Sequence, residues 1–446
     1  IDLKNKRLFS VISVLIVMVL ALSACAPAAV EPAAPEAPAA PAEPAAPAAP
    51  AAPVGAGELE PVRFLVFAMI SGPNAESGRQ VKMAVQTAEW YINEVLGGFP
   101  SLGGRPIYFN VVDSTSNAAQ APMPFEAALQ ANDYAVVIGN SNSSIALTQL
   151  PIVEAHQIPM ITGAAANIAI SEQGSSFSFQ PAATSRSFIP TQLDFLAYYA
   201  EKLGVPVKEL RLGLIHADDA WGTDNANNTR KQVAERGLNL VFDQSYNVAA
   251  FTDATPLITA LKAADVDVLL PSSYPADLSL IFTAMGTLNF NPLVVGGGAA
   301  MTWPSLYVDL GDAVNGLTSV DSWVWDQTGA REHEGWQVMN KWYEEQFGEF
   351  IPGQAGPTLF SIMLAYSAIE RIGSADPIAI RDELRVIDET NVDWFTIPAG
   401  VGKFDPVTGL NTGARAVMMQ WQNGRPTAVF PPEFAASPLL NPETMQ

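Results

Sequence analysis

Short apolar runs alternate with amphipathic stretches along most of this chain, and that alternation restricts the possible folds more than any other feature. Val62–Ile70 is an apolar run that ends in a Ser-Gly-Pro turn, and apolar residues then recur every three or four positions between Ser77 and Val95. The first pattern is typical of a strand and the second of one face of a helix. Further expected strands lie at 107–112, 135–138 and 159–162, with helices at 125–131 and 145–156. Such a series predicts a parallel sheet with helices on both faces.

A second series of the same kind starts after Gln180-Pro181. The expected strands are 210–216, 238–246, 268–270 and 293–295, and the expected helices are 188–203, 224–236, 255–264 and 278–288. The sequence therefore predicts an α/β fold with two consecutive lobes. The remainder, from Gly316, is mixed: helices are expected at 332–347, 357–372 and 378–384, and short strands near 402–404, 416–420 and 427–430. We expect the helical block to return to the first lobe, so that the chain crosses between the lobes several times.

Residues 1–24 have the pattern of a secretory signal. Lys4, Lys6 and Arg7 are followed by the almost wholly apolar Leu8–Leu22, which is the charge-then-apolar order of such signals. The run is shorter than the roughly 20 residues that cross a bilayer, although a short transmembrane anchor remains an alternative.

Cys25, the single cysteine of the chain, follows this apolar run directly. Leu22-Ser23-Ala24-Cys25 resembles the bacterial lipobox, where the signal is cut before the cysteine and the cysteine is acylated. The alternative of a buried structural cysteine lacks a folded segment around it. Residues 25–60 are mostly Ala and Pro, and prolines at this density block helices and favour an extended linker. We expect Cys25 to hold the chain on a membrane through two or three acyl chains.

The charge balance limits the partners of this protein. Forty-five acidic residues against 23 basic ones give a formal net charge of −22. Nucleic-acid binding needs a basic face, so we expect no nucleic-acid partner. One cysteine also excludes a disulfide framework and a thiolate metal site.

Residues for catalysis or metal binding are sparse. The chain has three histidines, at His156, His216 and His333, far apart and without metal-ligand spacing. No nucleophile elbow, P-loop or dinucleotide fingerprint occurs in the sequence. We therefore expect a protein that is not an enzyme and has no metal and no cofactor. His216, which follows an expected strand at a cleft edge, is the one histidine considered as a ligand contact.

The two predicted lobes share a local pattern at the ends of their strands. The strand through Ile138 runs into Asn140–Ser144, and the strand through Leu270 runs into Ser272-Ser273-Tyr274. In open α/β sheets, ligands bind beside the carboxyl ends of the strands. These hydroxyl-rich turns therefore indicate a candidate ligand site.

Several short motifs occur in a characteristic order between residues 61 and 430. They are Ser71-Gly72-Pro73 with Gly78, Asp113, Val137-Ile138-Gly139 before a serine-rich turn, Ile158-Pro159-Met160-Ile161, Trp221-Gly222, Phe251-Thr252-Asp253, and Gly402-Lys403-Phe404-Asp405 with Gly409. This order resembles the type I periplasmic solute-binding proteins, and within them the leucine/isoleucine/valine (branched-chain amino acid) group of ABC importers. The resemblance implies two doubly wound lobes with mainly parallel sheets, joined by a three-strand hinge. The implied boundaries are 61–183 with about 321–386 for the first lobe, and 184–320 with about 387–446 for the second.

The resemblance also implies a ligand site in the cleft between the lobes. In the first lobe the implied residues are Ser143, before an expected helix, and Ala164 and Ala166 after Ile161. A helix N-terminus with a hydroxyl suits a carboxylate, although Ser143 would serve equally as a helix cap. In the second lobe Trp221 and Tyr274 would enclose an apolar or aromatic ligand body, or else pack between the lobes.

Three further residues are candidates for the cleft. Ser77 occupies a position that is often aromatic in the family, and Trp303 and Trp323 lie where they could reach the ligand.

Two positions depart from the amino acid binders. Ala166 stands where those proteins usually offer a hydroxyl, and Gly298 aligns where they usually offer an acid for the ligand ammonium. An ammonium group buried without a partner is unfavourable. Either Asp218, Asp219 or Asp277 substitutes from another direction, or the ligand is an amide, a small carboxylate or another polar molecule.

The resemblance as a whole implies a monomeric, extracytoplasmic protein, anchored to the bacterial membrane through Cys25. It would bind an amino acid or related small solute and deliver it to ABC permease subunits. Two alternatives remain at this stage. The same fold could serve as a ligand sensor without transport, or as a hydrolase, which the missing nucleophile and base disfavour.

Overall fold

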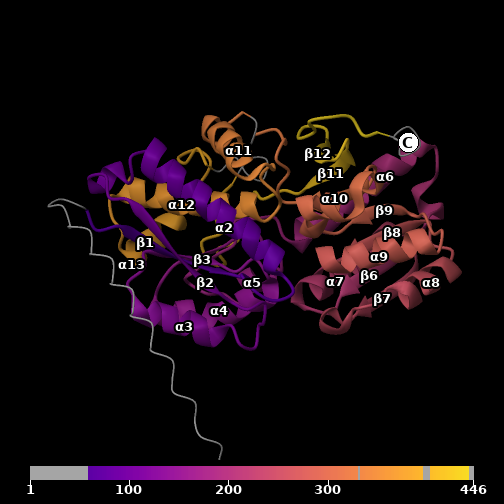
Figure 1. Cartoon of the computed structure of the whole chain (residues 1–446), viewed down its shortest axis with the longest axis horizontal. Helices are drawn as coiled ribbons and strands as arrows, with labels where there is room; N and C mark the ends of the chain where they lie inside the picture. The colour runs from indigo at the N-terminus through magenta and orange to yellow at the C-terminus, as the bar shows by residue number, and fades with distance from the viewer. Residues whose placement is uncertain (1–58, 330–331, 395–401, 441–446) are drawn as a thin grey trace, which may run out of the picture. The chain divides into compact units, whose positions relative to one another are not determined.

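Two β-sheets form the framework of the computed structural model, which describes residues 59–329, 332–394 and 402–440 (Figure 1). The first sheet has the order β2-β1-β3-β4-β5, and all its neighbouring strands are parallel. Its strands are β1 (Val62–Ala68), β2 (Ile107–Asp113), β3 (Val136–Gly139), β4 (Met160–Thr162) and β5 (Ser178–Phe179). We refer to this sheet and its helices as the first lobe.

The first lobe has helices on both faces of its sheet. They are α2 (Ala75–Trp90, extended by a π-helical turn Tyr91–Val95), α3 (Pro122–Ala131), α4 (Ser143–His156), α5 (Ala169–Glu172), α11 (Glu334–Phe347), α12 (Ala355–Ile372) and α13 (Pro377–Leu384). Along β1, Phe64 and Val66 pack in a core with α2 and α12, and the alternate residues Leu65 and Phe67 pack with α3 and α4. Strands buried on both faces read as near-continuous apolar runs, which explains the run, interrupted only by Arg63, that marked β1 in the sequence.

The second sheet has the order β12-β11-β10-β9-β8-β6-β7. Its strands are β6 (Arg211–Ala217), β7 (Asn239–Tyr246), β8 (Val268–Ser272), β9 (Leu293–Gly296), β10 (Thr318–Asp321), β11 (Val417–Gln422) and β12 (Arg425–Phe430). β7, β6, β8, β9 and β10 pair in parallel, whereas β11 and β12 add antiparallel strands beside β10. The predicted α/β class with two mainly parallel sheets is confirmed.

The second lobe also covers both faces of its sheet with helices. They are α6 (Ser185–Leu203), α7 (Ala220–Arg236), α8 (Thr255–Ala263), α9 (Pro275–Thr287) and α10 (Pro304–Leu310). One core joins Leu212 and Leu214 of β6 to α6 and α7, and the other joins Ile215 of β6 to α8, α9 and α10. Short 3-10 turns at Pro100–Leu102, Val207–Glu209, Val248–Ala250, Ala299–Thr302 and Gly311–Val314 complete the helical segments.

The chain passes between the two sheets three times: after β5, after β10 and before β11. Two of these passages lie side by side, because the amide of Gln180 donates to the carbonyl of Gly409 at 2.8 Å and the amide of Asn411 donates to the carbonyl of Gln180 at 3.0 Å. They are joined by a single bridge, Gln180 to Leu410, and not by a longer strand pair. The passages are therefore short extended segments.

Part of the C-terminal region packs with the first lobe. Ile387, Val392, Trp394 and Phe404 belong to the core that holds α2 and α12. Residues from about 387 onward were expected in the second lobe, whereas these four pack with the first. The segment 402–404, expected as a strand, makes only isolated bridges, Asp388 to Lys403 and Phe404 to Asn411.

Within the described residues, none of the helices combines the length and apolar character needed to cross a bilayer.

Candidate ligand-binding site

One small cavity is lined by residues of both lobes. Ser141, Ser143, Ala164 and Gln354 come from the first lobe, and Trp221, Tyr274 and Trp303 from the second. Its volume is about 30 Å³, room for one or two water molecules at most. The cavity lies beside the carboxyl ends of β3, β4, β6 and β8, the position at which open α/β sheets bind ligands.

The first-lobe wall is built on the start of α4. Asn142 is the N-cap of this helix, and its side-chain oxygen accepts from the amide of Ile145. Ser143 begins the helix, and its hydroxyl accepts from the amide of Asn167 at 3.2 Å. The unpaired amides and partial positive charge of a helix N-terminus favour an anionic group. This wall is therefore suited to a carboxylate.

The second-lobe wall is aromatic. Trp221 lies in the first turn of α7, Tyr274 is the N-cap residue of α9, and Trp303 is the N-cap residue of α10. The rings of Trp221 and Tyr274 are 5.1 Å apart and tilted by 50°. Aromatic side chains of this kind offer flat apolar surface together with polar N–H and O–H groups.

Tyr274 connects the two walls through its hydroxyl. It donates to Oδ2 of Asp219 at 2.5 Å and accepts from Nδ2 of Asn142 at 3.1 Å. Burial, followed by the neighbouring Asp219 carboxylate, raises the pKa of Tyr274 well above its usual value, so the phenol keeps its proton. The other oxygen of Asp219 accepts from the amide of Gly222 at 2.8 Å and caps α7.

Further hydrogen bonds join the lobes next to the cavity. Nδ2 of Asn167 donates to the carbonyl of Ala220 at 2.7 Å, and the amide of Ala220 donates to the hydroxyl of Ser144 at 3.3 Å. The amide of Ile168 donates to Asp224 at 3.2 Å. The starts of α4 and α7 thus face each other directly, with the cavity beside them.

The structure brings together four of the six residues proposed for the ligand site: Ser143, Ala164, Trp221 and Tyr274 line the cavity. Ser77 is buried on α2 and does not line the cavity. Its hydroxyl donates to Oε1 of Gln354, a residue of the first-lobe wall, at 3.4 Å. Ala166 is buried in the α6–α7 core, where its carbonyl accepts from the amide of Ser185. Ligand contact by any of the six remains a prediction.

A side chain at position 298 would require Trp221 to move. Gly298 has φ of 156°, and a Cβ placed there would lie 2.7 Å from Cζ2 of Trp221. The indole thus fills the space in which an acid at 298 would project. Among the alternative acids, Asp218 binds Asn247 and the amide of Val248 instead.

Asp277 and Asp219 differ in their contacts with the side chains that line the cavity. Asp277 is buried and accepts from the Tyr246 hydroxyl at 2.9 Å, and burial raises its pKa to about 6. Asp219 alone of the three acids bonds to a side chain that lines the cavity, Tyr274.

Three lining residues are additions to the proposed set. Ser141 lies in the serine-rich turn that the sequence had indicated. Trp303, considered only as a residue that could reach the cleft, lines the cavity and is 3% exposed, whereas Trp323 lies in the first-lobe core and donates to the carbonyl of Ile351. Gln354, before α12, carried no sequence signal, because it reaches the cavity only through the packing of α12 against α2.

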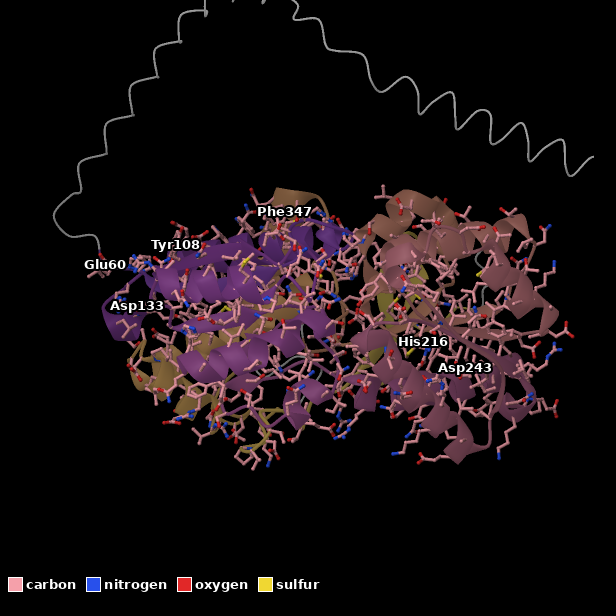
Figure 2. The ribbon with its side chains drawn as sticks, turned by 90° about the horizontal axis from the view of Figure 1, so that it is seen from below. Glu60, Tyr108, Asp133, His216, Asp243 and Phe347 are labelled. Atoms are coloured by element: carbon pink, nitrogen blue, oxygen red, sulfur yellow. The ribbon has the colours of Figure 1, made fainter. Side chains whose placement is uncertain are left out.

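His216 is a structural residue. Its Nδ1 lies 2.8 Å from the carbonyl of Ala217, and its Nε2 lies 3.1 Å from the guanidinium of Arg230. Arg230 also forms a two-point ion pair with Asp243, and Figure 2 shows His216 and Asp243 close together. Both ring nitrogens thus contact groups of the second lobe, and His216 is not among the residues that line the cavity.

The other histidines bind neighbouring groups as well: His156 contacts Glu126 at 2.8 Å, and His333 caps α11. In the described parts of the chain, His, Cys, Asp and Glu side chains do not gather in threes as a metal site requires.

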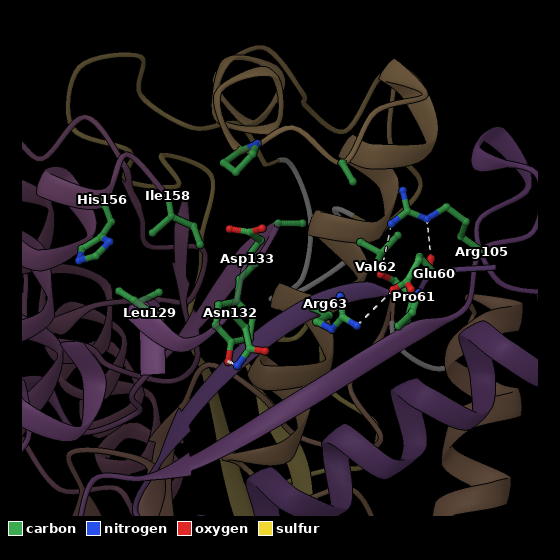
Figure 3. Close-up of a pocket in the computed structure, with 14 residues that line it drawn as sticks. Glu60, Pro61, Val62, Arg63, Arg105, Leu129, Asn132, Asp133, His156 and Ile158 are labelled. Atoms are coloured by element: carbon green, nitrogen blue, oxygen red, sulfur yellow. Dashed lines mark hydrogen bonds and ion pairs between the residues drawn. The ribbon is translucent and has the colours of Figure 1, made fainter. Parts of the chain in front are cut away.

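A much larger cavity, of about 540 Å³, lies at the opposite ends of the first-lobe strands (Figure 3). Its lining includes Glu60, Arg63, Arg105 and Asp133. The guanidinium of Arg63 pairs with Glu60 at 3.3 Å, and Arg105 donates to the carbonyl of Glu60 at 2.7 Å. This groove lies at the amino ends of β1 and β3, away from the edge where α/β sheets bind ligands. The smaller two-lobe cavity is therefore the better candidate.

Comparison with known proteins bears on the family and the fold of this chain. Residues 61–425 match the family model described as "Periplasmic binding protein". The chain is 26% identical over 378 residues to Leu/Ile/Val-binding protein homolog 7 of Brucella suis biovar 1, which covers 84% of this chain and 92% of that protein.

Solved structures share the fold. A leucine-binding protein of Thermotoga maritima matches with a TM-score of 0.70 at 20% identity, covering 82% of this chain and 97% of that one. A solute-binding protein of an ABC transporter from R. palustris, in complex with benzoate, matches with a TM-score of 0.70 at 15% identity, covering 86% and 99%.

Proposed function

Because this chain belongs to the type I periplasmic binding proteins of the branched-chain amino acid family, we propose that it is the solute-binding component of an ABC importer. It binds a small polar solute between its lobes outside the cytoplasm. The observation that carries this proposal is the cavity shared by Ser143, Ala164, Trp221 and Tyr274. Residues far apart in the sequence, on two separate sheets, meet there at the carboxyl ends of their strands.

The two walls of the cavity suit different parts of a ligand. The start of α4 suits the carboxylate of a ligand, and Trp221 and Tyr274 suit its apolar body. The relatives named above include a leucine binder and a benzoate complex, so the solute classes to consider are amino acids, amides and small carboxylates.

Binding stabilises a closed arrangement of the lobes. The hydrogen bonds from Asn142 to Tyr274 and from Asn167 to Ala220 cross from one lobe to the other, so they form only when the lobes approach. A ligand that contacts both walls shifts the population toward this state. The permease subunits recognise the closed form, and the ligand itself undergoes no reaction.

The binding proposal is tested by a thermal-shift screen of the full chain against amino acids, amides and small carboxylates. A ligand at 100 times its Kd stabilises the folded state by about 2.7 kcal/mol. Ser143→Ala and Tyr274→Phe should each reduce the shift given by the best ligand. Tyr108→Phe is the control, because Tyr108 is 49% exposed on the edge strand β2. Full response in both site variants would show that the ligand binds elsewhere.

A further inference from the structure

We propose that the cavity selects carboxylates that lack an α-ammonium group, and that Trp303 is a specificity-determining residue that donates its indole N–H to the ligand. This inference rests on the proposed function and narrows its solute class. The observations that carry it are the unpaired donors at the cavity, the absence of a charged group in its lining, and the blocked position 298.

Trp303 supplies a buried donor without a partner. The residue is 3% exposed, and its Nε1 is buried without a hydrogen-bond partner in the described part of the chain. A buried N–H group of this kind is unfavourable unless an acceptor reaches it. Since Trp303 lines the cavity, the acceptor that we assign to it is an oxygen of a ligand. The ligand would enter while the lobes are apart, because the closed cavity has room for only one or two water molecules.

Gln354 supplies a second donor on the opposite wall. Its Oε1 accepts from Ser77 at 3.4 Å, and its backbone amide donates to Gln80. Its side-chain NH₂ makes no hydrogen bond to any described residue, although Gln354 is 6% exposed. The cavity therefore has donors from both lobes, and with the start of α4 beside them they suit the two oxygens of a carboxylate.

An α-ammonium group finds no comparable partner. The lining residues are Ser, Ala, Trp, Tyr and Gln, and none of them carries a charge. Asp219 is the nearest acid in the bonding network, but one of its oxygens caps α7 and the other accepts from Tyr274, which lies between it and the cavity. An ammonium group desolvated in this space would remain unpaired, which is strongly unfavourable.

The ring of Trp221 packs against Gly298, so an acid at that position would clash with the ring in its present place. It occupies the volume beside Gly298 in which a side chain would project. The same ring and that of Tyr274 offer two tilted aromatic faces to the ligand body. A carboxylate with a planar or branched apolar body would contact both rings.

The test compares pairs of molecules that differ only in the α-ammonium group: leucine with 4-methylpentanoate, and phenylalanine with 3-phenylpropanoate. Affinities are measured by isothermal titration calorimetry of the full chain at pH 7. We expect each deaminated acid to bind at least about tenfold more tightly than its amino acid, since a buried unpaired charge is the difference between them.

Two variants test whether Trp303 and Gln354 donate hydrogen bonds to the ligand. Trp303→Phe keeps an aromatic ring but removes the N–H, and should weaken 4-methylpentanoate binding about tenfold. Trp342→Phe is its control, because Trp342 stacks on Trp90 in the first lobe and not at the cavity. Gln354→Glu replaces a donor by a carboxylate of the same shape and should reverse the preference, favouring leucine. It keeps the test valid if Trp303→Phe does not fold.

The outcomes separate this inference from the proposed function. Leucine or phenylalanine binding as tightly as its deaminated partner, or binding of amides alone, overturns the inference and leaves a solute-binding protein. Unchanged affinity in folded Trp303→Phe overturns the role of that residue. If no amino acid, amide or carboxylate binds, both proposals fail.

Discussion

Asp321 is the residue at which pH acts most directly on the connection between the lobes. It ends β10, where the chain leaves the second sheet, and it is fully buried. Oδ2 accepts from the hydroxyl of Thr302 at 2.7 Å, and Oδ1 accepts from the amide of Ser322 at 2.6 Å. Burial outweighs these hydrogen bonds and raises the pKa of Asp321 to about 7. The carboxyl group is thus largely protonated at mildly acidic pH in the folded protein.

Because its pKa is raised by folding, Asp321 lowers the free energy of unfolding as the pH rises. Between the unfolded value of 3.8 and the folded value of about 7, the folded state holds the proton more tightly than the unfolded chain, so the contribution of Asp321 to the free energy of unfolding falls with pH. Asp321→Asn removes this titration. We expect urea denaturation to show the variant gaining, relative to the parent, up to about 4 kcal/mol between pH 4 and pH 8. Parallel pH profiles for the two proteins would contradict the assignment.

At the scale of elements, the start of α4 has two functions that can be separated. Asn142 caps the helix and also donates to Tyr274 in the other lobe. Asp376 caps α13 in the same way, by accepting from the amide of Ala379 at 2.9 Å. Asp376 caps a helix of the first lobe and, among the described residues, has no bond like that from Asn142 to Tyr274, so Asp376 is a control for the loss of a cap alone.

We expect Asn142→Ala and Asp376→Ala each to lower the free energy of unfolding by about 1 kcal/mol, the usual effect of losing an N-cap. Only Asn142→Ala should also weaken binding of the best ligand from the screen, by about threefold to tenfold, because it removes a bond of the closed state. Urea denaturation and calorimetric titration measure the two effects. Equal affinities in the two variants would show that the bond between Asn142 and Tyr274 does not contribute to closure.

The same elements show what the sequence can and cannot predict. β1 and β6 were located within a few residues because each is a mostly apolar stretch between turn signals, as is typical of strands buried on both faces. Ser143 and Tyr274 were proposed because the family resemblance implies them and because they lie in the hydroxyl-rich turns that follow β3 and β8; that they line one cavity agrees with this proposal. Gln354 was missed because α12 is buried on nearly every side, so its sequence shows no polar face to indicate which end approaches the cavity. The position of Trp221 beside Gly298 depends on how the ring packs, which spacing in the sequence does not reveal.

At the scale of the whole molecule, the anchor proposed from the sequence lies outside the described residues. We propose that Cys25 carries the lipid that holds this protein at the membrane surface, because it follows an apolar signal-like segment and precedes an Ala/Pro-rich linker. Acyl chains of this kind hold a protein at a membrane for long times when two or more are present.

Cys25→Ser should shift the protein from the detergent phase to the aqueous phase in a Triton X-114 partition of cells that make bacterial lipoproteins. A radiolabelled fatty acid should be incorporated into the parent and not into the variant. Ligand affinity should be equal in both, since Cys25 is not among the residues that line the cavity. Label retained in Cys25→Ser would place the lipid on another residue.

The late position of α12 in the chain has a consequence for the order in which the protein can assemble. This helix fills the centre of the first-lobe core, against α2 and beside β3 and β4, yet it follows the whole of α6–α10 in the sequence. The N-terminal half of the chain is synthesised first. The apolar side chains of the first-lobe core that pack against α12 therefore stay exposed until Ala355–Ile372 has been made. Contacts between such distant segments slow folding. The first lobe therefore cannot complete its core until Ala355–Ile372 has been synthesised.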